Sequence, residues 1–242
     1  MPEKTYPIYW LLIERTPASL SEAGAFLSPG EQQKLSRMRF PKRRDEWLLG
    51  RWTAKTLICS LPGHQAFSPT EIEIVNTPEG APQVCFPDGR ISPFCLSISH
   101  SGLLAFCALT RVPGLKIGVD LEKIEPRSKG FVEDYFTTAE KQLVDSFPLG
   151  EQQAVVTLIW SLKEAMLKAL GVGLHRDTRQ VEVLAIWDEI PGVWQAAAIG
   201  EPGIRNRPWS AWWQRRGDFV MTIAGFTEHA GPSSVSLVEQ HA

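Results

Sequence analysis

Two carboxylates at alternate positions of an apolar run are the first residues in this sequence that could do chemistry. Asp120 and Glu122 lie in the run Gly-Val-Asp-Leu-Glu at 118–122, and on a β-strand both side chains point to one face, roughly 6–7 Å apart. Two like charges buried in an apolar strand are costly unless a cation compensates them. Mg2+ takes oxygen ligands and keeps waters for a phosphate substrate. The pair therefore indicates either a magnesium site or a half-exposed strand with two solvated carboxylates.

An anion and a cation four residues apart follow about forty residues later. Glu164 and Lys168 share one face of a helix with Trp160, because a helix turns once in 3.6 residues. Such a pair is also a common surface stabiliser worth about 0.2–0.5 kcal/mol. The bulky Trp160 and the mostly apolar helix around it favour a site over a surface salt bridge.

Three cations line one face of an earlier helical segment. Arg44, Arg51 and Lys55 are separated by seven and four residues, and these steps return to almost the same helical angle. Such a stripe could hold a phosphate. Long basic side chains on a helix are also often simply solvated, so both interpretations stay open at this point.

Hydroxyls and an imidazole crowd into the segment 97–102, which reads Ser-Ile-Ser-His-Ser-Gly between two apolar runs. Hydrogen-bond donors concentrated at a strand end suit an anion. Serine and histidine together also suggest a hydrolase. The sequence has no Gly-x-Ser-x-Gly elbow, however, and adjacent residues on a strand face opposite ways, so the hydrolase interpretation is the weaker one.

Length and composition predict a globular protein. The chain has 242 residues, 43% apolar and 21% charged, which favours one two-lobed domain. No segment is long and apolar enough to cross a membrane, and the N-terminus lacks the pattern of a secretory signal, so we expect a soluble cytoplasmic protein. The 25 basic and 27 acidic residues nearly cancel, so bulk charge does not imply nucleic-acid binding. The four irregularly spaced cysteines predict buried, reduced thiols.

Hydrophobic runs and turn residues place these motifs on secondary structure. Strands are expected at 6–13, 72–75, 83–86, 94–98, 103–109, 116–121, 181–187, 193–199, 209–214 and 219–224. Helices are expected from a cap at Ser28, over 41–59, from a capping box at Thr137, and over 151–170 before Gly171. The turn residues at 111–114 mark a lobe boundary, and the tail after Thr227 is expected to be mobile.

Taken in order, three of these motifs resemble a known family. The segments 97–101, 118–122 and 160–164 with Lys168 are similar to motifs of the 4′-phosphopantetheinyl transferases, particularly the two-lobed monomeric type typified by the surfactin-synthetase activator. The helical region 44–55 also fits. The resemblance spans roughly residues 5–226, and the last two motifs in combination are highly specific.

The resemblance implies a fold and a separate role for each lobe. The expected fold class is α+β, a pseudo-dimer of two similar α/β lobes with the active site in the cleft between them. Residues 1–113 would form the N-terminal lobe with the nucleotide-binding elements for coenzyme A, and residues 114–229 the C-terminal lobe with the metal and catalytic motifs. Residues 230–242 would be a mobile tail.

The resemblance also implies the reaction and its central residues. The enzyme would transfer 4′-phosphopantetheine from coenzyme A to a serine of an apo acyl or peptidyl carrier protein, leaving adenosine 3′,5′-bisphosphate. Asp120, Glu122 and Glu164 would coordinate Mg2+ against the pyrophosphate, and Glu164 would also serve, directly or through water, as the base for the carrier serine. Lys168 would neutralise phosphate charge. Lys163 is a motif residue without a fixed role.

Residues of the first lobe are implied to bind the nucleotide. His100, beside Ser99, would meet the 3′-phosphate region of coenzyme A together with Arg44. Arg51 and Lys55 belong to the same basic face. The remaining contacts would come from the backbone of the turn Gly80-Ala81-Pro82. Many relatives have lysine where this chain has Ala81, so Gly80 and Pro82 keep the turn while a cation is lost.

Two other functions use the same residues. A magnesium-dependent phosphohydrolase or nucleotide enzyme would use the carboxylates with water as the acceptor, although the sequence lacks a second aspartate-rich motif. A non-enzymatic coenzyme A or nucleotide-binding module would use them only for structure.

Overall fold

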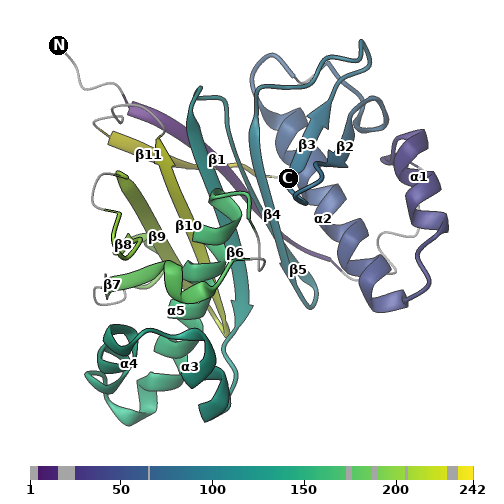
Figure 1. The fold of residues 1–242 in the computed structure, drawn as a ribbon. Coiled ribbons are helices and arrows are strands. Elements are labelled where there is room, and N and C mark those ends of the chain that lie inside the picture. The colour runs from purple at the N-terminus through teal and green to yellow at the C-terminus, as the bar shows by residue number, and fades with distance from the viewer. Residues whose placement is uncertain are drawn as a thin grey trace. The chain divides into compact units, whose positions relative to one another are not determined.

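The structure is a computed structural model that describes residues 5–15, 25–64, 66–172, 176–186, 190–204, 207–227 and 234–241. The chain divides into two compact units, Met1–Pro113 with Pro232–Ala242, and Gly114–Gly231, and each has its own sheet (Figure 1). We call them unit 1 and unit 2. All four cysteines are free thiols, but of the four only Cys107 is buried as expected. Within the described ranges, no helix combines the length and the hydropathy that a membrane span needs.

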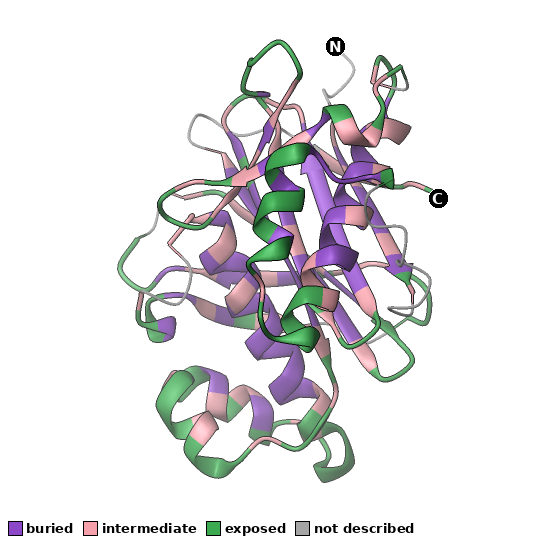
Figure 2. Ribbon diagram, turned by 90° about the vertical axis from the view of Figure 1, so that its right-hand side faces the viewer, coloured by how far each residue is buried: buried purple, intermediate pink, exposed green. Residues whose placement is uncertain are grey.

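Unit 1 is a four-stranded sheet covered by a long helix. Its strands are β1 (Thr5–Glu14), β4 (Cys95–Ser101), β5 (Leu104–Thr110) and β11 (Ser234–Glu239), in the order β11-β1-β5-β4. The other elements are α1 (Pro29–Ser36), α2 (Pro41–Ser60), the 3-10 helix η3 (Pro69–Glu71), and the hairpin of β2 (Glu73–Asn76) and β3 (Pro82–Cys85). Apolar residues of α2 form one core with β1 and β5. Figure 2 shows buried residues along the strands and exposed ones mostly at turns and outer helix faces.

One expectation for the end of the chain is wrong. Residues 234–239 do not form a mobile tail but the strand β11, which pairs in parallel with β1 so that Leu237 lies opposite Ile8. β1 already pairs with β5 on its other side, and an unpaired edge would leave a row of backbone donors and acceptors open. The tail therefore completes the sheet. The rest of the expected tail, 228–233, lies outside the described residues, as does the last residue of the expected strand 181–187.

Unit 2 is a five-stranded antiparallel sheet with helices on one face. Its strands are β6 (Leu115–Lys123), β7 (Glu182–Ile186), β8 (Gln195–Gly200), β9 (Trp209–Arg216) and β10 (Phe219–Thr227), in the order β6-β10-β9-β8-β7. Its helices are α3 (Lys129–Tyr135), α4 (Thr138–Asp145), α5 (Leu149–Ala169) and the 3-10 helix η5 (Thr178–Gln180). α5 packs across β6 and β10 (Figure 1). It ends where expected, because Gly171 has a φ of 70° that breaks the helix.

The closest approach between helix and sheet in unit 2 is at Gly118. An added Cβ at Gly118 would lie 2.0 Å from the backbone oxygen of Ala165 and 2.6 Å from the backbone nitrogen of Ala169. These distances leave no room for a side chain, so only glycine lets α5 lie against β6 here. The contact fixes the height at which the last turns of α5 cross the strand that carries Asp120 and Glu122.

We predict that Gly118→Ala lowers the free energy of unfolding by about 3 kcal/mol, because backbone atoms of α5 cannot move aside cheaply. Urea unfolding followed by circular dichroism measures the change. The matched control is Gly150→Ala in the first turn of the same helix, where an added Cβ meets nothing within 4 Å. That change should raise stability by up to about 1 kcal/mol. Equal stability of Gly118→Ala and the parent would contradict the packing argument.

Candidate active site

Three carboxylates of unit 2 share one electrostatic neighbourhood. Asp120 and Glu122 come from β6 and Glu164 from α5, and Asp120 is only 4% exposed. Burial, with the nearby charges of Asp120 and Glu122, raises the pKa of Glu164 to about 7 although Lys168 opposes the shift. Burial and Asp120 also raise the pKa of Glu122. The predicted metal ligands therefore lie within range of each other's charge.

Cations of the same unit hold two of these carboxylates. Lys168 Nζ donates to Asp120 Oδ1 at 2.7 Å and to the backbone oxygen of Val119 at 3.0 Å. Glu122 accepts from Arg127 Nη2 at 2.8 Å through one oxygen and from Trp160 Nε1 at 3.1 Å through the other. Trp160 therefore orients Glu122 from the helix, which gives this motif residue a direct part in the site.

Glu164 differs from the other two carboxylates. Its Oε1 atom is buried and, among the described residues, receives no hydrogen bond. A buried acceptor without a donor is unfavourable and is a common sign of an absent ion or water. A hydrogen-bond donor or a metal ion would therefore bind favourably at Glu164 Oε1.

The donor set suits a hard divalent cation, although the ligands are not assembled around one. Over the described ranges, no group of three or more His, Cys, Asp or Glu side chains is arranged to hold a metal ion. The reason lies in the pairs above, because Lys168 and Arg127 already take oxygens of Asp120 and Glu122. Three carboxylates with an undonated oxygen on Glu164 nevertheless match the oxygen preference of Mg2+. The residues present thus fit the metal that the sequence predicts.

The structure gives Lys163 a structural role. Its side chain and that of Glu140 are both fully buried, and Lys163 Nζ donates to Glu140 Oε2 at 2.6 Å and to the backbone oxygen of Val181 at 2.9 Å. Glu140 closes the capping box of α4 with Thr137 and accepts from the backbone nitrogen of Val183 at 2.9 Å. Lys163 therefore ties α5 to the start of α4 and, through Glu140, to β7.

Unit 1 contains a similar buried ion pair, and it involves two residues of the predicted phosphate-binding stripe on α2. Lys55 is 1% exposed; its ammonium is paired with Glu31 and donates to the backbone oxygens of Phe26 at 2.8 Å and Pro69 at 2.9 Å. Arg51 is also buried, 3.5 Å from Glu31. Helical periodicity correctly placed Arg51 and Lys55 on one face of α2, but at these two residues that face points into the core. Lys55 and Arg51 are therefore internal counter-ions of Glu31 and are not placed to receive a phosphate.

Other predicted nucleotide contacts in unit 1 are divided between exposed and buried positions. Arg44 and His100 are exposed, and His100 Nδ1 lies 3.9 Å from Glu46 Oε2 of α2. Ser99 is buried because it is on the opposite face of β4. Arg44 and His100 thus lie at the surface, whereas Ser99 faces the interior.

The turn at Gly80 is tied to α1 and α2 by a residue that the sequence analysis missed. Asn76 Nδ2 donates to the backbone oxygen of Gly80 at 2.7 Å, and Asn76 Oδ1 accepts from Arg51 Nη2 at 3.1 Å and from Lys34 Nζ at 3.4 Å. Gly80 has a φ of 95°, which favours glycine, and Pro82 begins β3 directly after the turn. Arg51 thus supports the turn from inside the unit.

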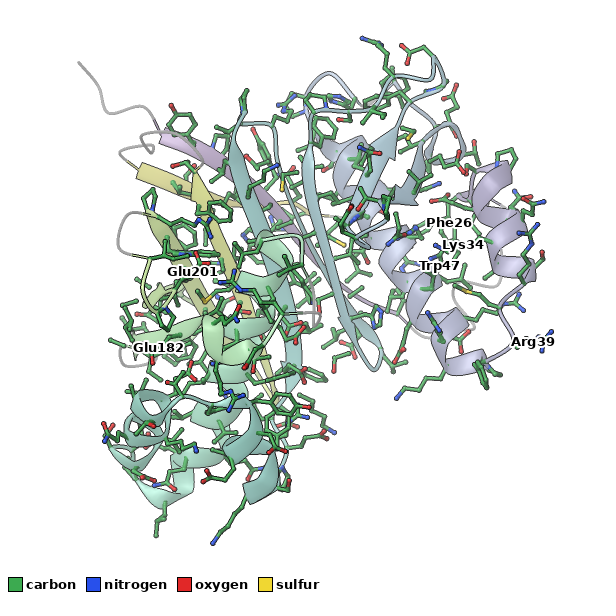
Figure 3. All side chains as sticks on the ribbon, viewed as in Figure 1. Phe26, Lys34, Arg39, Trp47, Glu182 and Glu201 are labelled. Carbon is green, nitrogen blue, oxygen red and sulfur yellow. The ribbon has the colours of Figure 1, made fainter. Side chains whose placement is uncertain are left out.

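Lys34 is the second residue that was missed. It lies on α1, exposed, beside the ring of Trp47 on α2 (Figure 3). Burial first, and then the charges of Arg51 and Arg43, lower the pKa of Lys34. These positive charges repel each other, and an anion bound near the Gly80 turn would reduce that repulsion. The sequence analysis missed Lys34 because no spacing in the sequence links a lysine on one helix to an arginine on the next. The basic character of the region was the only signal for it.

Known proteins resemble this chain in the same regions. A family model described as the 4′-phosphopantetheinyl transferase superfamily matches residues 116–224, which include all three carboxylates and Lys168. The 4′-phosphopantetheinyl transferase HetI of Nostoc sp. is 28% identical over 166 residues, 68% of each chain. Two Bacillus subtilis proteins, the 4′-phosphopantetheinyl transferases Sfp and ffp, are 29% and 30% identical over 170 residues, covering 69% of this chain and 71% of theirs.

Solved structures give a weaker likeness. One described as an ACPS–CoA complex of Chronobacterium ammoniagenes covers 48% of this chain and 98% of its own, at 16% sequence identity and a TM-score of 0.36. A score of this size carries no weight for the assignment of the site.

We predict that Lys163→Met destabilises the protein by about 3–5 kcal/mol, because it leaves Glu140 buried without a counter-ion. Thermal and urea unfolding measure the loss. The double variant Lys163→Met/Glu140→Gln should recover part of it, since the uncompensated charge is gone. The control is Lys141→Met, which breaks a surface pair with Glu133 and should cost less than about 1 kcal/mol. A small effect of Lys163→Met would contradict the structural role.

We predict that Glu164→Gln stabilises the metal-free protein at pH 8. Burial raises the pKa of Glu164 in the folded protein to about 7, from an ordinary value of 4.5. The folded state therefore holds the proton more tightly than the unfolded state, and it loses stability as pH rises between these two values. The glutamine is neutral at every pH and avoids that loss. Urea unfolding at pH 4.5 and pH 8 in EDTA should give a gain only at pH 8. An equal effect at both pH values would contradict the shifted pKa.

Proposed function

Since this chain belongs to the 4′-phosphopantetheinyl transferases, it is an enzyme that transfers phosphopantetheine to carrier proteins, and we propose that coenzyme A is its donor and Mg2+ its metal. The observation that carries the proposal is the group Asp120, Glu122 and Glu164, with a buried Glu164 oxygen that no described residue donates to. The three residues would hold Mg2+ beside the pyrophosphate of the donor.

The residues of unit 2 suit attack of a serine hydroxyl on phosphorus. Bound Mg2+ would supply positive charge to the phosphate oxygens. The serine oxygen forms a bond to the phosphorus while the bond to the adenosine 3′,5′-bisphosphate leaving group breaks. Glu164 accepts the serine proton, directly or through water, at an oxygen that is open to a donor. Lys168, which donates to Asp120, would neutralise phosphate charge if Asp120 held the metal.

Unit 1 is proposed to bind the nucleotide end of coenzyme A. Exposed Arg44, His100 and Lys34 provide donors for the 3′-phosphate region, and the backbone at Gly80 and Pro82 provides further contacts. Arg51 acts indirectly, because Asn76 connects it to the Gly80 turn. Lys55 takes no part. Ala81 leaves the turn without the lysine found in many relatives, and Lys34 supplies a cation to the same turn through Asn76.

The expectation of two similar lobes is supported by a shared set of internal contacts. In unit 1 the capping-box residue Glu31 pairs with a buried lysine of the long helix and accepts from the backbone nitrogen of Ile74. In unit 2 Glu140 does the same with Lys163 and the backbone nitrogen of Val183. In both cases the glutamate and the strand nitrogen are 43 residues apart. This parallel favours a duplicated ancestral unit, and the active site between the lobes stays a prediction.

The remaining expectations are a monomer in the cytoplasm that binds no nucleic acid, and these also stay predictions. A phosphohydrolase or a coenzyme A-binding module would have the same carboxylates but would not modify a carrier. Incubation of the protein with an apo carrier protein, coenzyme A and Mg2+, followed by mass spectrometry of the carrier, separates the three functions. Transfer adds phosphopantetheine to the carrier serine. No mass gain on any of several acyl and peptidyl carriers would overturn the proposed donor and reaction.

We predict that Asp120→Ala reduces transfer by at least about 100-fold in this assay, because it removes a metal ligand and the partner that positions Lys168. Circular dichroism should show an intact fold, since the change also removes a like charge from beside Glu122 and Glu164. The control is Glu125→Ala, an exposed carboxylate just after β6, which should keep normal rates. Near-normal transfer by Asp120→Ala at saturating Mg2+ would show that Asp120 is not a ligand.

A further inference from the structure

Arg127 contacts the carboxylate group, and neither the sequence motifs nor the proposed mechanism uses it. It lies in the loop between β6 and α3, five residues after Glu122. Its Nη2 atom donates to Glu122 Oε2 at 2.8 Å, and its guanidinium carbon lies 5.2 Å from the centre of the Phe131 ring. The side chain is 21% exposed. Arg127 is therefore held in place by an ion pair on one side and a ring on the other.

The ring that holds Arg127 is itself part of the site. Phe131 packs edge-on against Trp160 with ring centres 4.8 Å apart, and Trp160 donates to Glu122. Glu122 is thus approached by Trp160 on one oxygen and by Arg127 on the other. A metal ion that bound Glu122 through Oε2 would compete with Arg127 for that oxygen.

The guanidinium also has unused hydrogen-bonding capacity. Its Nε atom is buried and, within the described part of the chain, donates to no acceptor. A guanidinium is a planar fork that binds phosphate oxygens through two donors at once. A phosphate bound to the metal beside Glu122 would offer such acceptors where Arg127 already lies.

We propose that Arg127 is a built-in competitor of the metal: it occupies Glu122 in the metal-free enzyme, and when a divalent cation takes that oxygen it turns to the phosphates of the donor substrate. The inference rests on the proposed function, because it takes Glu122 as a metal ligand. Metal and phosphate then favour each other's binding, because the metal releases Arg127 from Glu122 and the phosphate holds it away. Arg127 weakens the binding of metal alone and strengthens the binding of phosphate to the loaded site.

The test is a titration of the full-length protein with Mn2+, followed by electron paramagnetic resonance of the free ion, and then a titration with pyrophosphate at saturating Mn2+. Arg127→Gln should bind Mn2+ about two- to fivefold more tightly, the range for removal of one partly exposed charge pair, and pyrophosphate about two- to fivefold more weakly. Arg127→Lys keeps the charge without the fork, so its Mn2+ affinity should match the parent while its pyrophosphate affinity falls.

Two further variants make the outcome decisive. Lys129→Gln removes an exposed charge two residues away and should change neither affinity. Glu122→Gln should weaken Mn2+ binding strongly. If Glu122→Gln binds Mn2+ like the parent, the metal assignment fails and the role of Arg127 falls with it. If Glu122→Gln loses Mn2+ while Arg127→Gln keeps parental or weaker Mn2+ affinity, the metal site stands and the competitor role of Arg127 is overturned.

Discussion

The contact between α5 and β6 at Gly118 determines how the charged groups of these two elements meet in the candidate site. The helix backbone comes so close to the strand that a Cβ on Gly118 would lie 2.0 Å from Ala165 O. At that height Lys168 reaches both Val119 O and Asp120, and Trp160, two turns earlier, reaches Glu122. The strand carboxylates and the helix residues are therefore placed by one backbone contact. Side-chain flexibility has little to do with it, because the donors are fixed by α5 as a rigid element.

The site carries more negative charge than its own cations neutralise. Lys168 and Arg127 pair with Asp120 and Glu122, and the third carboxylate, Glu164, is left with a raised pKa and a buried oxygen without a donor. Such an arrangement costs stability in the absence of a ligand and is typical of functional sites. In the function proposed above, a divalent cation would remove the imbalance and leave Lys168 and Arg127 free to bind phosphate.

Sequence patterns predicted those parts of the molecule that depend on local order. The alternation at 118–122 and the helical spacing of Trp160, Glu164 and Lys168 placed one group correctly, because strand and helix periods determine which residues share a face. The same spacing argument failed for Arg51 and Lys55. Periodicity shows that residues share a face, but it does not show whether that face meets solvent or core, and their partner Glu31 comes from another helix.

The residues that the sequence did not reveal have long-range partners. Asn76 is found only through its bonds to α1, α2 and the Gly80 turn, and β11 only through the open edge of β1.

Anomalous X-ray scattering from crystals grown with Mn2+ would show directly whether the three carboxylates of unit 2 hold a divalent cation. We expect one anomalous peak bound by oxygens of Asp120, Glu122 and Glu164, with Lys168 released from Asp120. A peak bound by other residues, or none at saturating Mn2+ with the Lys168–Asp120 pair intact, would contradict it.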